Sequence, residues 1–161
     1  SGGNILFFQS LGILPENCYA NEIIPERAAQ LRENLPGSPV FEGNALDLTF
    51  ENQFDIVFQS TVFTSVQSQQ NRQLLADKMK QMMKQDGIIL WYDFLYDNPK
   101  NKDVSGIRKK EIISLFKPLQ LISFKKVTLA PPIGRRVGKF YPFFNFFPLL
   151  RTHCIAVFKK P

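Results

Sequence analysis

The chain has 161 residues, of which 44% are hydrophobic and 21% are charged, so its length and composition predict one globular domain with a sizeable core. Residues 1–99 hold 6 basic and 12 acidic groups, whereas residues 100–161 hold 14 basic and 2 acidic groups, which favours an anionic partner for the second part. Two cysteines and one histidine argue against a disulfide framework and a structural zinc site, and no stretch approaches the ~20 apolar residues of a membrane span.

The predicted elements alternate between helices and strands. Pro25 fits the first position of a helix, where the backbone N–H that proline lacks would have no partner anyway. Apolar residues recur on one helical face between Leu75 and Met83, and Gly87 is expected to end that helix. In chain order, the sequence predicts a helix at 4–11, a strand at 17–23, a helix at 25–34, strands at 39–41 and 54–58, a helix at 68–85, a strand at 88–92, a helix capped by Ser105 that runs to 116, a strand at 119–129, an irregular or helical segment at 130–150, and a strand at 152–158.

This order favours an α/β fold, a mostly parallel sheet with helices on both faces. The last two strands are separated only by the segment 130–150, so we expect an antiparallel last strand. No linker divides the chain, which predicts a single domain over 1–161 with a basic, aromatic insertion at 131–151. No leader sequence is visible, and this favours a cytoplasmic protein.

Three features stand where open α/β sheets bind ligands. Ser1-Gly2-Gly3-Asn4 is either a glycine turn that offers the N–H groups of a helix start to a ligand, or the remnant of an expression tag. Glu22 ends a strand, so its carboxylate either accepts hydrogen bonds from a ribose diol or lies at a helix N-terminus. Gly43-Asn44-Ala45-Leu46 either binds an adenine edge through the Asn44 amide or forms an ordinary turn.

With the strand FDIVF at 54–58, these features resemble the class I S-adenosylmethionine-dependent methyltransferases over nearly the whole chain. SGGNILFFQSLGI is similar to the end of the family's glycine-rich first motif, and ANEIIPERAAQLREN is similar to its second strand, ribose-binding acid and following helix. GNALDLTF is similar to the motif that usually reads Gly-Asp-Ala, FDIVFQSTVFTSV to the fourth strand and active-site loop, and MMKQDGIILWYDF to the fifth strand. The tail, VTLAPP followed by LLRTHCIAVFKKP, resembles a bacterial subgroup associated with surface-polysaccharide gene clusters.

The resemblance implies a Rossmann-like domain that binds S-adenosylmethionine and releases S-adenosylhomocysteine. No metal is expected, because Gln59-Ser60-Thr61 supplies no carboxylate at the end of the fourth strand. It places the donor on Gly2, Gly3, Glu22, Ile23, Asn44, Ala45, Leu46, Gln59 and Ser60. It places the acceptor near Thr61, Tyr92, Phe94, Arg135 and Arg136. Asp93 is the candidate general base, or else a carboxylate that caps a loop. His153, which lies in an apolar strand, is expected to be a core or sheet-end residue rather than a base.

The chain departs from the family pattern at two places. The family's first strand and first two motif glycines would precede Ser1, so we expect residues upstream of this start, because the neighbours of that strand would otherwise expose unpaired edges. Asn44 stands where an aspartate is common, although its amide can still hydrogen-bond an adenine amino group.

The segment from Pro131 to Arg151 contains the cations Arg135, Arg136 and Lys139, followed by six aromatic residues between 140 and 147. It is either a lid or interfacial patch for an anionic or lipid-linked acceptor, with 140–147 meeting a membrane surface or a second subunit, or a helical insertion that packs on the sheet. The favoured function is methyl transfer to a small-molecule, glycan or lipid-linked acceptor that carries negative charge. The alternative is a donor-binding or partner-binding domain without catalysis. Nucleic-acid methylation is disfavoured because the chain lacks the Asn/Asp-Pro-Pro-aromatic loop that is usual in amino methyltransferases acting on nucleic-acid bases.

Overall fold

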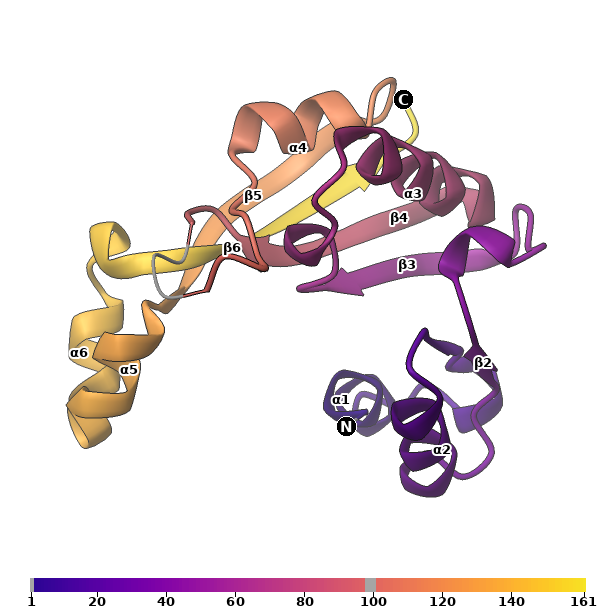
Figure 1. The fold of residues 1–161 in the computed structure, drawn as a ribbon, viewed down its shortest axis with the longest axis horizontal. Coiled ribbons are helices and arrows are strands. Elements are labelled where there is room, and N and C mark those ends of the chain that lie inside the picture. Colours follow the sequence, from indigo (N-terminus) through magenta and orange to yellow (C-terminus); the bar gives the residue numbers. More distant parts are fainter. Residues whose placement is uncertain (1, 98–100) are drawn as a thin grey trace. The chain divides into compact units, whose positions relative to one another are not determined.

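The computed structural model describes residues 2–97 and 101–161 (Figure 1). The chain forms two compact units, one up to Thr49 and the other from Phe50 to Pro161, and each unit is described by itself. Helices and strands alternate in both, so the predicted α/β class is confirmed. The single domain over 1–161 stays a prediction. No helix within the described ranges is long and apolar enough to cross a membrane.

The first unit is a pair of short parallel strands with two helices. Its elements are α1 (Gly3–Ser10), the 3₁₀ turn η1 (Pro15–Asn17), β1 (Ala20–Glu22), α2 (Pro25–Asn34), β2 (Val40–Glu42) and the 3₁₀ turn η2 (Ala45–Asp47). α2 begins at Pro25, as predicted, and buries Leu31 against Ala20 and Leu35. The strand expected over 17–23 is wrong at its start, because Pro15 opens a 3₁₀ turn there and β1 is confined to three residues.

The second unit is a four-stranded sheet in the order β3-β4-β6-β5. β3 and β4 are parallel, whereas β6 runs antiparallel to both β4 and β5, as predicted for the last strand. α5 and α6 lie beyond one end of the β5–β6 pair, away from α3 and α4 (Figure 1). The elements are β3 (Phe54–Ser60), η3 (Phe63–Ser65), α3 (Gln69–Met82), β4 (Met83–Phe94), α4 (Lys109–Leu115), β5 (Gln120–Leu129), α5 (Pro131–Val137), η4 (Gly138–Phe140), α6 (Tyr141–Asn145), η5 (Pro148–Leu150) and β6 (Arg151–Lys159).

The core of the second unit is aromatic and lies on one face of β4. Trp91 is fully buried, with its ring 4.7 Å from that of Phe63 and 5.8 Å from that of Phe116. The alternation of the strand turns Tyr92 to the opposite face, where it is only half-buried. The face of β4 that carries Trp91 therefore packs in the core, and the candidate residue Asp93 lies on this same face.

The helix predicted over 68–85 is too long. α3 ends at Met82, and Met83 is the first residue of β4, where it pairs with Phe54 and is fully buried. Gly87 does not end a helix. A side chain there would lie 2.9 Å from the carbonyl oxygen of Phe54, so glycine permits β3 to pass close to β4. Pairing with β3 thus overrides a local helical pattern.

Ser105 is not the cap of a helix that runs to 116. α4 begins at Lys109, with Arg108 as its N-cap residue, and ends at Leu115. The Ser105 hydroxyl instead accepts a hydrogen bond from the Arg72 guanidinium. The Ser105 side chain therefore serves as a hydrogen-bond acceptor for the buried Arg72 and does not cap α4.

Candidate functional site

The carboxyl ends of β1 and β2 lie side by side in the first unit. The N–H of Gly43 donates to the Glu22 carbonyl oxygen at 2.9 Å, and the Asn21 amide donates to the Gly43 carbonyl oxygen at 3.1 Å. Gly43 has φ +120°, which favours glycine, and open space surrounds its Cβ position. The structure therefore brings together two of the three features singled out in the sequence, around Glu22 and Asn44.

The Glu22 side chain is half-buried at this edge. Its Oε1 accepts a hydrogen bond from the N–H of Ile24 at 3.1 Å, just before α2 begins. This contact is the helix-start arrangement that was one of the two alternatives for Glu22. Its second oxygen accepts no hydrogen bond from residues 2–97 or 101–161, so the carboxylate keeps acceptor capacity for a ligand hydroxyl.

Asn44 and its neighbours form a local turn. The Asn44 Oδ1 accepts from the N–H of Leu46 at 3.0 Å, and this bond caps η2. Ala45 and Leu46 are half-buried, while Ile23 on the neighbouring strand end is 63% exposed. Ile23 therefore presents an apolar side chain to solvent at the end of β1.

The Gly2–Gly3 turn lies against the side chains of Leu31 and Leu35 in the first unit. Gly2 is left-handed, with φ +73°, and its Cβ position is 3.2 Å from Leu35, just past the last residue of α2. The Leu31 side chain, 3.3 Å from the same Cβ position, packs with Ala20 of β1, which lies two residues before Glu22. The role of Gly2 and Gly3 as donor ligands stays a prediction.

In the second unit, the chain leaves β3 in a tight turn that is bonded to the end of β4. The Thr61 N–H donates to the Tyr92 carbonyl oxygen at 2.8 Å, and Thr61 has φ +56°. Gln59 is buried, and its Oε1 accepts from the Val62 N–H at 3.2 Å. Ser60, between Gln59 and Thr61, is half-buried. These bonds fix the predicted site residues at the carboxyl end of β3.

Asp93 is fully buried and bonded to this turn. Its Oδ1 accepts from the Thr64 hydroxyl at 2.7 Å and from the Phe94 N–H at 2.9 Å, and its Oδ2 accepts from the Thr64 N–H at 3.3 Å. Burial raises the pKa of the Asp93 carboxyl, and these hydrogen bonds oppose the rise. The contacts correspond to the loop-capping alternative, and the role of Asp93 as a base stays a prediction.

The other face of the β4 end carries a group of aromatic and hydroxyl side chains. The Tyr92 hydroxyl lies 3.0 Å from the Thr128 hydroxyl, and the Tyr92 ring stacks on His153 at 5.2 Å. The Phe94 ring lies 4.0 Å from His153, which is buried at the start of β6. Burial lowers the pKa of His153, so its neutral form is favoured. Tyr92 and Phe94, both predicted near the acceptor, are thus adjacent.

Three residues with structural roles near the candidate site or in the core were not predicted from the sequence. Thr64 binds Asp93 across 29 residues, and Thr128 binds Tyr92 across 36 residues, so neither pair has a periodic signal in the sequence. Arg72 is buried although its neighbours in the sequence are polar, and it pairs with Glu111 at 2.8 Å. The position of Arg72 as the single arginine in the glutamine-rich tract at 67–73 is the one sequence feature that sets it apart.

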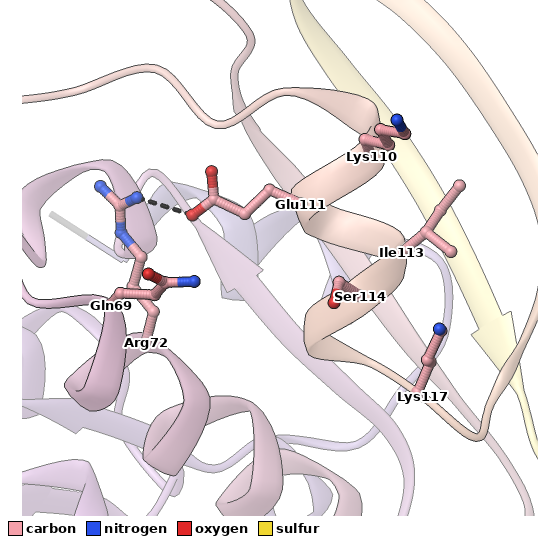
Figure 2. Close-up of a pocket in the computed structure, with 7 residues that line it drawn as sticks. All are labelled: Gln69, Arg72, Lys110, Glu111, Ile113, Ser114 and Lys117. Atoms are coloured by element: carbon pink, nitrogen blue, oxygen red, sulfur yellow. Dashed lines mark hydrogen bonds and ion pairs between the residues drawn. The ribbon is translucent and has the colours of Figure 1, made fainter.

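A pocket lies between α3 and α4, where Figure 2 shows the ion pair of Arg72 and Glu111 at its wall. It contains none of the residues predicted for donor or acceptor.

Arg135 and Arg136 are both exposed on α5, at the end of β5. Within the described ranges, no group of three or more histidine, cysteine, aspartate or glutamate residues could hold a metal ion. The residues that line the pocket between α3 and α4 are Gln69, Arg72, Lys110, Glu111, Ile113, Ser114 and Lys117.

Comparison with known proteins gives a family match and many similar folds. A family model described as a methyltransferase domain matches residues 1–91, which is more than half of the chain. No curated protein sequence matches it. The chain is similar to the PH0226 protein from Pyrococcus horikoshii, with a TM-score of 0.72, 12% identity, and coverage of 99% of this chain and 77% of that one.

Two other solved structures carry informative descriptions. A SAM-dependent methyltransferase from Archaeoglobus fulgidus has a TM-score of 0.71 and 10% identity, with coverage of 99% of this chain and 81% of that one. The 1,6-didemethyltoxoflavin-N1-methyltransferase of Burkholderia thailandensis, solved with 1,6-didemethyltoxoflavin and S-adenosylhomocysteine, has a TM-score of 0.68 and 15% identity, with coverage of 99% and 66%. At these identities the similarity shows a shared fold.

Proposed function

Because the chain belongs to the methyltransferase-domain family, we propose that it transfers the methyl group of S-adenosylmethionine to a small-molecule, glycan or lipid-linked acceptor that carries negative charge. The observation that supports the donor is the edge formed by Glu22 and Gly43, which presents a carboxylate beside open space. When bound, S-adenosylmethionine supplies a methyl group that is already activated by its sulfonium. The protein then has to hold the donor and acceptor in line and exclude water.

The donor residues are proposed in each unit by itself. In the first unit, the second oxygen of Glu22 would accept from the ribose, and Asn44 would face the adenine edge. Ile23, Ala45 and Leu46 would cover the ring, because they are the apolar side chains of that edge. In the second unit, Gln59 and Ser60 are proposed for the donor, and Gly2 and Gly3 complete the proposed set.

The acceptor side is proposed from the second unit. Arg135 and Arg136 are exposed cations, and arginine binds carboxylate and phosphate groups through two parallel hydrogen bonds. Thr61, Tyr92 and Phe94 are proposed to line the path of the acceptor. A carrier-linked sugar of the kind used in surface polysaccharides would fit this charge and these aromatic residues.

Asp93 is proposed as the general base that removes a proton from the acceptor, and the alternative is a carboxylate that only caps the Thr64 turn. A base is required only where the acceptor is a hydroxyl or a protonated amine. Three hydrogen bonds hold the carboxylate within the protein, and they fix the turn that follows β3.

Calorimetry with S-adenosylhomocysteine tests the donor assignment. We expect Glu22→Ala to weaken binding by about 1–3 kcal/mol, because it removes hydrogen bonds to a charged acceptor. Glu26→Ala, which removes an exposed carboxylate from the first turn of α2, is the matched control and should bind as the wild type does. Equal affinities for the two variants would refute the role of Glu22.

Transfer of a radiolabelled methyl group to a panel of sugar phosphates, carboxylic acids and lipid-linked sugars tests the activity itself. A chain that binds S-adenosylhomocysteine but labels none of these acceptors would support the alternative of a donor-binding domain. A chain that is folded and binds no donor would contradict the proposed function.

A further inference from the structure

An exposed apolar surface follows β5 in the second unit. We call it the phenylalanine patch, and it lies over η4, α6 and η5. These large side chains are turned to solvent to an extent that is unusual for a folded protein, since a cluster of exposed apolar groups marks an interaction site. The patch consists of Phe140 (59% exposed), Phe143 (64%), Phe146 (76%), Phe147 (44%) and Leu149 (93%).

The patch is an ordered surface and not a loose collection of side chains. The Phe147 ring lies edge-on at 5.6 Å from Phe143 and at 5.8 Å from Phe146. Arg151, at the start of β6, donates through its guanidinium to the carbonyl oxygen of Asn145, and so ties the end of α6 to the sheet. The rings therefore remain together on a support provided by β5 and β6.

Basic residues precede the patch along the chain, and the stretch that holds both contains no carboxylate side chain. Arg135, Arg136 and Lys139 are exposed on the segment that leads into it, and the Lys139 ammonium lies 5.5 Å above the Phe140 ring. No residue from 112 to 161 is an aspartate or a glutamate. A partner for this surface must therefore offer an apolar region and negative charge together.

We infer that the phenylalanine patch docks on an anionic lipid membrane, with its rings at the boundary between headgroups and acyl chains. Apolar side chains enter that boundary while basic residues around them attract the acidic headgroups. The helices of the described ranges are too short to cross a membrane, so the contact is one with the surface. This docking goes beyond the proposed methyl transfer and does not depend on it.

A second copy of the chain and a nucleic acid explain the patch less well. A twofold dimer through this surface would bring the same cations of two copies together without a carboxylate from residues 112–161 to pair with them. A nucleic acid would pair its phosphates with the cations and could stack its bases on the rings. It would offer no apolar partner to the aliphatic side chain of Leu149, which is 93% exposed.

The test is cosedimentation of the full chain with vesicles. One preparation contains phosphatidylglycerol and phosphatidylcholine, and the other contains phosphatidylcholine alone. We expect binding to the anionic vesicles to be at least about tenfold stronger, and Phe146→Ser combined with Leu149→Ser to reduce it by about tenfold or more. Lys139→Gln should reduce it about fivefold. Leu74→Ser makes the same replacement of an apolar side chain by serine at an exposed position of α3. It is the matched control and should have no effect on vesicle binding.

Several outcomes would overturn the inference. These are equal binding of the double variant and the wild type, equal losses in the double variant and Leu74→Ser, and no preference for anionic vesicles. Loss of self-association in the double variant, measured by sedimentation equilibrium without vesicles, would indicate a second copy instead. Circular dichroism of each variant checks that it is folded. We expect the double variant to fold, because Phe146 and Leu149 are highly exposed.

Discussion

His153 shows how one residue can link packing to pH. It is the only histidine of the chain, it is buried between the rings of Tyr92 and Phe94, and burial lowers its pKa below 6.5. A neutral imidazole fits this aromatic surrounding, whereas an imidazolium would have to be desolvated there. The folded state therefore resists protonation of His153 more than the unfolded state does.

The sign of the resulting pH dependence is fixed by this difference. Below about pH 6.5 the unfolded state binds a proton that the folded state does not, so the free energy of unfolding falls as the pH is lowered towards the folded pKa. The contribution is fully present above pH 6.5, and its slope is at most about 1.4 kcal/mol per pH unit.

We expect His153→Phe to remove this slope between about pH 5 and 7.5, the range in which an ordinary histidine titrates. Urea unfolding of the wild type and the variant at several pH values measures it, and the difference between the two isolates His153 because other groups are common to both. Above pH 7.5 the difference should become constant. A difference that does not vary with pH would show that burial does not perturb this residue.

At the scale of elements, the turn after β3 is held by the end of β4. Thr64 supplies both its N–H and its hydroxyl to Asp93, and Thr61 bonds to the Tyr92 carbonyl. Two parallel strands and the turn between β3 and α3 therefore form one bonded group. Because Asp93 is fully buried, the loss of one of its hydrogen bonds is costly.

We expect Thr64→Val, which preserves shape and removes the hydroxyl, to lower the free energy of unfolding by about 1–3 kcal/mol near neutral pH. The loss should shrink at low pH. Burial raises the pKa of Asp93, so this residue costs stability as the pH rises through that pKa and the carboxylate forms, and the Thr64 hydroxyl offsets part of that cost.

Urea unfolding at about pH 4 and at about pH 7 checks this expectation. Ser65→Ala removes an exposed hydroxyl from the neighbouring position and should leave stability unchanged. A Thr64→Val penalty that is the same at both pH values would mean that the hydroxyl does not serve a buried carboxylate.

The elements also show where sequence-based prediction succeeds and where it stops. The bounds of α2 follow from a local signal, the proline at its first position, and the structure begins the helix there. The end of α3 does not, because the apolar pattern continues to Met83 and only pairing with Phe54 turns that residue into a strand. The Asp93–Thr64 pair could not be predicted either, since 29 residues separate two side chains that meet only when β3 and β4 pair.

At the scale of the whole molecule, charge divides the chain more sharply than any motif. The 14 basic residues after position 99 face only 2 acidic ones, while the first 99 residues carry an acidic excess. The proposed donor carries a positive sulfonium, and a cluster of cations would repel it. Donor and acceptor binding should therefore respond differently to a loss of basic charge.

We expect Arg135→Gln combined with Arg136→Gln to raise the apparent KM of an anionic acceptor found in the labelling panel, and to leave the affinity for S-adenosylhomocysteine unchanged. Each bidentate arginine contact contributes about 1.5–3 kcal/mol, so the increase should be tenfold or more. Lys102→Gln combined with Lys125→Gln removes the same charge from two exposed positions of the basic part and is the matched control. If both double variants raise KM equally, the general field of the basic part attracts the acceptor and the two arginines have no direct contact with it. If donor affinity falls in the arginine variant alone, the arginines belong to the donor side, and the proposed division of the site is wrong.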